Sequence, residues 1–107
     1  MTPRESHIAM LIQLRIKHQD PKAEVILFGS HARGQATEES DWDILILMDR
    51  PKKDRSIEER YREEIFQLEL EIGEAISTFV YSKKDWETKH VYSPFYQNIK
   101  KEGIKLT

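Results

Sequence analysis

Apolar residues recur at helical spacing in the first part of the chain, and local signals mark both ends of this stretch. Thr2 and Glu5 form a Thr-x-x-Glu capping box around Pro3, which fits the first position of a helix. Asp20-Pro21 ends the helix, because proline disfavours the α conformation in the residue before it. The apolar stripe between these ends consists of Ile8, Leu11, Ile12 and Ile16.

A second helical stripe occupies the middle of the chain, and its members are Ile57, Tyr61, Ile65, Leu68 and Ile72. Ser56 and Glu59 form another capping box, so we expect this helix to begin near Ser56. Gly73 follows the stripe, in the position where glycine often ends a helix. A shorter helix is predicted over residues 94–101, whereas residues 86–92 show no clear period.

Short apolar runs alternate with these helices. Residues 25–28, 41–48 and 76–81 are rich in branched or aromatic side chains, as buried strands are. Residues 104–106 are either a terminal edge strand or an ordered tail. Strands that alternate with helices predict an α/β (α+β) fold, in which a small mixed β-sheet has helices packed against it. We expect a single domain over residues 1–107.

The composition narrows the classes of protein that fit. The 107 residues include no cysteine, which excludes disulfides and thiolate metal sites. The longest apolar run, residues 44–48, is far shorter than the roughly 20 residues that span a bilayer, and residues 1–10 lack a secretion signal. A soluble cytoplasmic protein with no membrane partner is therefore expected. The net charge of −2 argues against broad nucleic-acid binding but not against a small anionic ligand.

Candidate chemistry gathers between the first two predicted strands. Gly29-Ser30 follows the first strand, and Asp41 and Asp43 begin the second. Two residues apart on a strand, these carboxylates point to the same face and repel each other unless a cation compensates them. Mg²⁺ prefers oxygen ligands and usually takes one or two carboxylates together with substrate phosphates. Gly29 has no Cβ to block a phosphate, and a helix beginning at Ser30 would add free N–H groups.

Each of these pieces alone is more often an ordinary strand-to-helix turn or a cap. Their combination within one short segment, with apolar residues on both sides, favours a site for phosphate and magnesium. Phosphoryl and nucleotidyl transfer need such a site, because they depend on positioning and on neutralisation of charge.

Phe28-Gly29-Ser30, followed after ten residues by Asp41-Trp42-Asp43-Ile44, resembles the signature of the DNA polymerase β-like nucleotidyltransferase superfamily. Within that superfamily, residues 29–34 with Ser40-Asp41 resemble the minimal nucleotidyltransferases of bacteria and archaea. The similarity extends through the weaker motifs at residues 81–86 and 94–100, so it covers most of the chain.

The resemblance implies transfer of a nucleoside monophosphate from a nucleoside triphosphate, with ATP expected, to a hydroxyl acceptor. It implies that Asp41 and Asp43 are catalytic and bind Mg²⁺, and that Gly29, Ser30 and Arg33 bind the nucleotide. Members of this family often act as the antitoxin of a HEPN-domain protein and can adenylylate it. A homodimer is the other assembly that we expect.

The family's third carboxylate normally lies on the next strand and helps to deprotonate the attacking hydroxyl. In this chain the alignment puts Ser77 or Thr78 there, and no Asp or Glu lies in residues 76–82. Glu74 is the nearest acid upstream. The alternative function is therefore a catalytically degenerate module that binds a nucleotide or a partner, and a structural dimer subunit is a further alternative.

Residues close to these motifs have two interpretations each. Arg33 pairs either with a phosphate or, at the surface, with Glu38 or Glu39. His31 is expected to be an exposed helix residue rather than a base. Aromatic residues in the last third of the chain are expected to form core or docking contacts rather than a base-stacking platform; they are Trp86, Tyr92, Phe95 and Tyr96.

Overall fold

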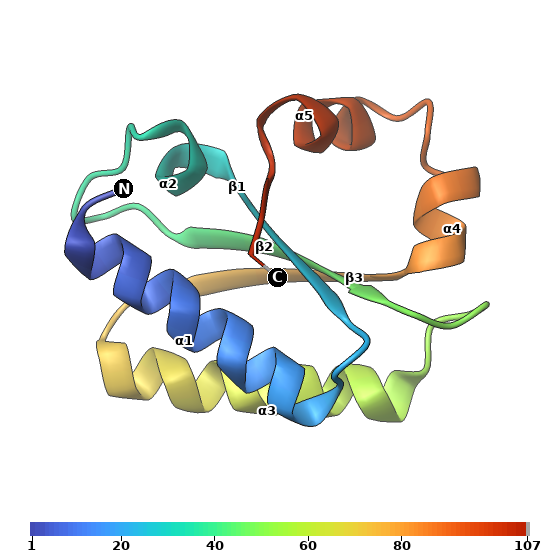
Figure 1. Cartoon of the computed structure of the whole chain (residues 1–107), viewed down its shortest axis with the longest axis horizontal. Coiled ribbons are helices and arrows are strands. Elements are labelled where there is room, and N and C mark those ends of the chain that lie inside the picture. Colours follow the sequence, from blue (N-terminus) through green and yellow to red (C-terminus); the bar gives the residue numbers. More distant parts are fainter. Residues whose placement is uncertain (107) are drawn as a thin grey trace.

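The computed structural model describes residues 1–106, which form one four-stranded sheet between two layers of helices (Figure 1). The elements in chain order are α1 (Pro3–Gln19), β1 (Glu24–Phe28), α2 (Gly29–Arg33), β2 (Trp42–Met48), α3 (Arg55–Ile72), β3 (Ile76–Ser82), α4 (Lys83–Thr88), α5 (Pro94–Glu102) and β4 (Ile104–Lys105). The predicted mixed sheet with packed helices is confirmed.

The strand order across the sheet is β3-β2-β1-β4. β1 runs antiparallel to both β2 and β4, whereas β2 and β3 run parallel, with α3 as the crossover that a parallel pair requires. Phe28, the last residue of β1, lies opposite Asp43 on β2, and Asp43 lies beside Ser77 on β3. The register therefore brings the end of β1 and the beginnings of β2 and β3 together at one end of the sheet.

Each face of the sheet has its own helix layer and its own apolar cluster. α1 and α3 cover one face, and α4 and α5 cover the other (Figure 1). The residues of the larger cluster that are completely inaccessible include Ile12, Ile16, Val25, Leu27, Trp42, Ile44, Ile46, Met48, Tyr61 and Leu68. The smaller cluster consists of Leu45, Leu47, Trp86 and Ile99, with Phe95 and Tyr96 packed against it. Of the four aromatic residues expected in core or docking contacts, Trp86 is thus in the core, whereas Tyr92 is 94% exposed.

The end signals of α1 act as predicted, and those of α3 differ. In α1 both hydrogen bonds of the Thr2/Glu5 capping box are present. The predicted Ser56/Glu59 capping box is wrong, because the N-cap of α3 is Asp54, whose carboxylate accepts the N–H groups of Ser56 and Ile57. An ionised carboxylate serves two free N–H groups at once, so Ser56 falls inside the first turn.

Two segments that the sequence left open are now assigned. Ser82 ends β3 and caps α4 by accepting the N–H of Asp85, and the first part of the ambiguous residues 86–92 belongs to this short helix. Residues 104–105 form the edge strand β4, paired with Ile26 and Leu27 of β1.

Side chains of α3 reach the outer edge of β3, which is an edge strand of the sheet. Glu69 accepts the N–H of Ile76 at 2.9 Å, and Arg62 donates to the carbonyl of Thr78 at 3.1 Å. Both contacts use backbone groups that a neighbouring strand would otherwise pair.

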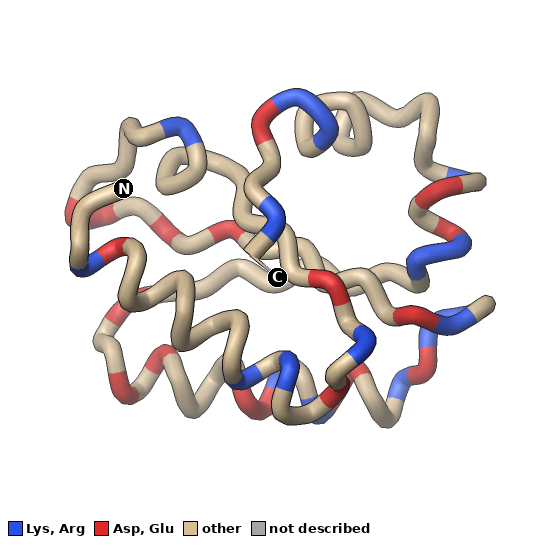
Figure 2. Tube along the Cα trace, viewed as in Figure 1, with Lys and Arg blue, Asp and Glu red and all other residues tan. Residues whose placement is uncertain are grey.

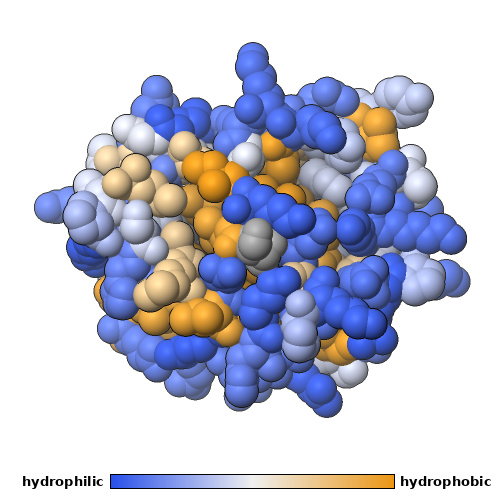
Figure 3. All heavy atoms as spheres, in the orientation of Figure 1, coloured by the Kyte–Doolittle hydropathy of each residue, from blue (hydrophilic) through white to orange (hydrophobic). Residues whose placement is uncertain are grey.

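The surface is largely hydrophilic on the face that Figure 3 shows, with separate apolar patches. Acidic positions gather along the connection from α2 to β2, beside the end of β1 (Figure 2). Among residues 1–106, no helix combines the length and the apolar character that crossing a membrane requires.

Candidate active site

Gly29 and Asp43 are in direct contact at the end of the sheet where β1 stops. Gly29 has φ of +77°, in the left-handed region that L side chains rarely adopt. A Cβ built on Gly29 would lie 2.2 Å from Oδ2 of Asp43, so the carboxylate fills the space of the missing side chain. The glycine is needed twice here, for the backbone turn and for the approach of Asp43.

Asp41 and Ser77 complete the group on the same side of the sheet. Asp41 lies just before β2, and its Oδ2 is 3.4 Å from the hydroxyl Oγ of Ser77, which donates to it. Because strand residues alternate between faces, Ser77 shares the face of Asp43, its register neighbour. Thr78 is the neighbour of Ile44 and points to the opposite face, so of the two candidate positions only Ser77 faces the aspartates.

The two aspartates form an acidic pair whose negative charge is only partly compensated. Burial raises the pKa of the Asp43 carboxyl above its ordinary value, and the negative charge of Asp41 raises it further. The charges of His31 and Arg33 act in the opposite direction. A carboxylate whose ionised form is disfavoured in this way is suited to a cation, and the oxygen-only donors of Asp41 and Asp43 fit Mg²⁺.

Within residues 1–106, no cluster of three or more His, Cys, Asp or Glu side chains is arranged to hold a metal ion. A carboxylate pair is nevertheless a usual protein contribution for Mg²⁺, since this ion commonly keeps water and substrate phosphates as its other ligands. Asp41 and Asp43 are therefore the residues that would hold it.

Ser30 and Arg33 lie on α2, directly after Gly29. Ser30 is half-buried, and Arg33 is exposed and forms an ion pair. A surface ion pair of Arg33 was expected with Glu38 or Glu39. Its partner is instead Glu102 at the end of α5. Arg33 also donates to the side chain of Gln35.

The prediction that His31 is exposed is wrong. The imidazole is only 4% exposed, because it stacks on the indole of Trp42, with ring centroids 3.8 Å apart and planes 8° from parallel. Its Nδ1 lies 2.7 Å from Oε2 of Glu5, the carboxylate of the capping box on α1. His31 thereby links α2 to the beginning of α1 and to the first residue of β2.

A family model described as a nucleotidyltransferase domain matches residues 10–106. The chain belongs to the nucleotidyltransferase domain family. Over 94 residues this nucleotidyltransferase is 36% identical to a protein of Methanocaldococcus jannaschii that carries the provisional name protein adenylyltransferase. The alignment covers 87% of this chain and 86% of that protein. No solved structure matches the chain.

Two features around the candidate site had no signal in the sequence. Glu102 reaches Gly29 and Arg33 from a helix that is far away along the chain. His31 is buried by contacts with Glu5 and Trp42, although its own segment has no apolar pattern. Neither contact can be read from local spacing, because both depend on how α5 and α1 pack beside α2.

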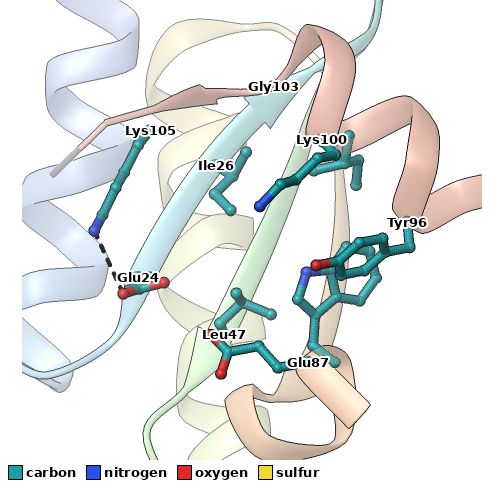
Figure 4. A pocket seen from close by; sticks show the side chains of 10 residues that line it. Glu24, Ile26, Leu47, Glu87, Tyr96, Lys100, Gly103 and Lys105 are labelled. Carbon is teal, nitrogen blue, oxygen red and sulfur yellow. Dashed lines mark hydrogen bonds and ion pairs between the residues drawn. The ribbon is translucent and has the colours of Figure 1, made fainter. Parts of the chain in front are cut away.

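The hollow of about 310 Å³ in Figure 4 lies away from this site, towards the other end of β1. Ile26 and Leu47 form part of its floor, Tyr96 and Lys100 of α5 point into it, and Lys105 pairs with Glu24 at its rim. None of the predicted site residues lines it. The candidate site at the end of the sheet and this hollow are therefore separate.

Proposed function

We propose that this nucleotidyltransferase uses ATP and Mg²⁺ to transfer a nucleoside monophosphate to a hydroxyl group of a partner protein. The observation that carries the proposal is the contact between Gly29 and Asp43. It places a carboxylate pair suited to a divalent cation directly against the glycine that begins the segment proposed to bind phosphate. The family match supports nucleotidyl transfer, and the name of the M. jannaschii relative supports a protein as acceptor.

In this proposal the residues at the end of the sheet divide the work. Asp41 and Asp43 hold Mg²⁺, which when bound neutralises charge on the triphosphate and on the departing pyrophosphate. Gly29 keeps Asp43 in position and, with Ser30, offers N–H groups to the phosphates. Arg33 supplies a positive charge that a guanidinium can present to two oxygens of one phosphate.

The acceptor is the remaining reactant. Its hydroxyl oxygen bonds to the α-phosphorus while the bond from that phosphorus to the pyrophosphate breaks, and the hydroxyl proton passes to water or to a base of the partner protein. In line with the family, we propose a HEPN-domain protein as acceptor and this chain as its antitoxin, acting in the cytoplasm. Homodimer formation is part of the same proposal, with exposed Tyr92 available for contact.

The test is label transfer from ATP that carries ³²P at the α-phosphate, with Mg²⁺ and a HEPN-domain protein as acceptor. The acceptor should gain the label and the mass of one nucleoside monophosphate. Asp43→Asn should remove the transfer, whereas Asp49→Asn should preserve it, because Asp49 is an exposed aspartate just beyond the opposite end of β2. Equal transfer by the two variants would show that the acidic pair is not the reacting centre.

A second candidate function is a nucleotide-binding or partner-binding module without turnover. The observation in its favour is Ser77, a neutral hydroxyl that faces Asp41 where the family pattern has its third carboxylate. Glu74 does not replace that acid in the present arrangement, because it is paired with Arg4 at 2.6 Å. Binding of Mg–ATP without transfer to any acceptor would favour this second function.

A further inference from the structure

Glu102 lies beside the groups that the proposed function gives to the triphosphate. Its Oε1 accepts the N–H of Gly29 at 3.4 Å. Both of its oxygens accept from Nη1 of Arg33, at 3.2 Å and 3.1 Å. One carboxylate from the end of α5 thus contacts a backbone donor and a guanidinium of the phosphate-binding segment.

A carboxylate and a phosphate are recognised by the same donors. Both are anions with oxygens spaced for a guanidinium, and both accept charge-assisted hydrogen bonds from backbone N–H groups. While Glu102 accepts the single hydrogen of the Gly29 N–H, a phosphate cannot accept it. Arg33 keeps the N–H groups of Nη2, but its Nη1 is turned towards Glu102. Two anions that compete for shared donors weaken each other's binding.

Charge strengthens this competition. Asp41, Asp43 and Glu102 bring three acids to the end of the sheet, against Arg33 as their cation. Glu102 is also close enough to Asp43 to contribute to raising the pKa of that carboxyl. A triphosphate that approaches this site is therefore repelled by the charge of Glu102, and it also finds N–H groups of Gly29 and Arg33 already bonded to that carboxylate.

We propose that Glu102 competes with the triphosphate for the same binding position. The Glu102 carboxylate occupies the phosphate-binding position before nucleotide binds and is displaced when it does. The proposal rests on the proposed function, because it assumes that Gly29 and Arg33 receive phosphate. Glu102 thereby limits affinity for phosphate anions that arrive without enough binding energy to displace it. A nucleoside triphosphate with Mg²⁺ offers more contacts than an isolated anion and displaces it more readily.

The experiment measures binding of inorganic tripolyphosphate without metal, and of Mg–ATP, by isothermal titration calorimetry. Glu102→Gln keeps the shape of the side chain and removes its charge, so tripolyphosphate should bind about three- to tenfold more tightly than to the wild type, as expected for a partly exposed ion pair. Glu63→Gln is the matched control, since Glu63 is exposed on α3 across the sheet, and it should leave both affinities unchanged. Unchanged or weaker tripolyphosphate binding by a folded Glu102→Gln protein would overturn the proposal.

The displacement of Glu102 can also be followed by NMR in the wild type, so this test does not depend on the folding of a variant. Tripolyphosphate should shift the carboxyl ¹³Cδ resonance of Glu102 together with the Nε–H resonance of Arg33, because the ion pair opens. A shift of Arg33 while Glu102 stays unchanged would mean that no displacement occurs, which refutes the competition.

The two proposals fail in different ways. If the wild type binds Mg–ATP and Glu102→Gln binds tripolyphosphate no better, the competition is refuted and the nucleotide site stands. If neither the wild type nor any variant binds Mg–ATP while Glu102→Gln gains affinity for tripolyphosphate, the competition at an anion-binding position is supported and the proposed function is refuted.

Discussion

The contact between Gly29 and Asp43 can be tested by adding one methyl group. In Gly29→Ala the new Cβ would lie 2.2 Å from Oδ2, 3.1 Å from Cγ and 3.2 Å from Cβ of Asp43. The alanine would also have to adopt φ of +77°. Two costs therefore add, one from the backbone conformation and one from the carboxylate that must move.

These costs can be separated by magnitude. The left-handed conformation costs an L residue about 1–2 kcal/mol, and forcing a packed neighbour aside costs about 1–3 kcal/mol. The sum of about 2–5 kcal/mol is a large part of the roughly 5–15 kcal/mol that holds a small domain folded. Gly73 is the matched control, because its φ is +71° and no atom lies within 4 Å of its built Cβ, so Gly73→Ala should show the backbone cost alone.

Urea unfolding, followed by fluorescence of the buried residues Trp42 and Trp86, measures both costs. In an Asp43→Ala background the obstacle is gone, so the cost of Gly29→Ala should fall to that of Gly73→Ala. The coupling free energy of the double-mutant cycle should be about 1–3 kcal/mol. An equal cost of Gly29→Ala in both backgrounds would refute the reasoning, since it would mean that the Asp43 carboxylate does not lie over Gly29.

Further predictions follow from the charges and faces of the site. The pKa of Glu5 is about 2 instead of 4.5, held down by the N–H of Thr2 and then by His31, so its stabilisation is complete above about pH 4.5 and is lost as the pH falls towards 2. Glu5→Gln should therefore make acid unfolding less steep in that window by circular dichroism, and an unchanged pH dependence would contradict it. The pKa of Asp43 is raised, so the protonated form is favoured in the folded state and stability falls as the pH rises through that pKa. Asp43→Asn should accordingly raise the midpoint of thermal unfolding at pH 7 when a chelator removes divalent cations. A lower midpoint would argue against the destabilisation by the ionised Asp43 carboxylate. Ser77→Asp should speed nucleotidyl transfer, by up to roughly 10²–10⁴-fold for a well-placed base, without tightening Mg–ATP binding. Thr78→Asp, on the opposite face of β3, should not speed it. Equal label-transfer rates for the two variants would contradict the placement of Ser77 at the position of the third carboxylate.

Local signals predicted most of the elements because each needs only neighbouring residues. The capping box of Thr2 and Glu5, and the left-handed glycine at residue 73, are determined within one or two turns. The strands followed from continuous apolar runs, since both faces of the sheet are covered by helices. Asp54 was missed as a cap because Ser56 offered a second plausible start two residues later.

The candidate site was only partly predictable, because its remaining contacts join distant residues. Ser77 and Thr78 could not be separated without the register, as a shift of one residue exchanges the faces of a strand. His31 is buried by Glu5, 26 residues away, and Arg33 is paired with Glu102, 69 residues away. No local pattern encodes such distances, so these contacts become visible only when the helices are packed.

The two side chains of α3 that reach β3 have a consequence for aggregation. An exposed edge strand is a template on which another chain can add a strand. A chain that approached β3 would first have to remove Glu69 from the N–H of Ile76 and Arg62 from the carbonyl of Thr78. The first half of β3 is thus protected against pairing with a strand of a neighbouring molecule. At high protein concentration, Glu69 and Arg62 of α3 therefore oppose aggregation through this edge.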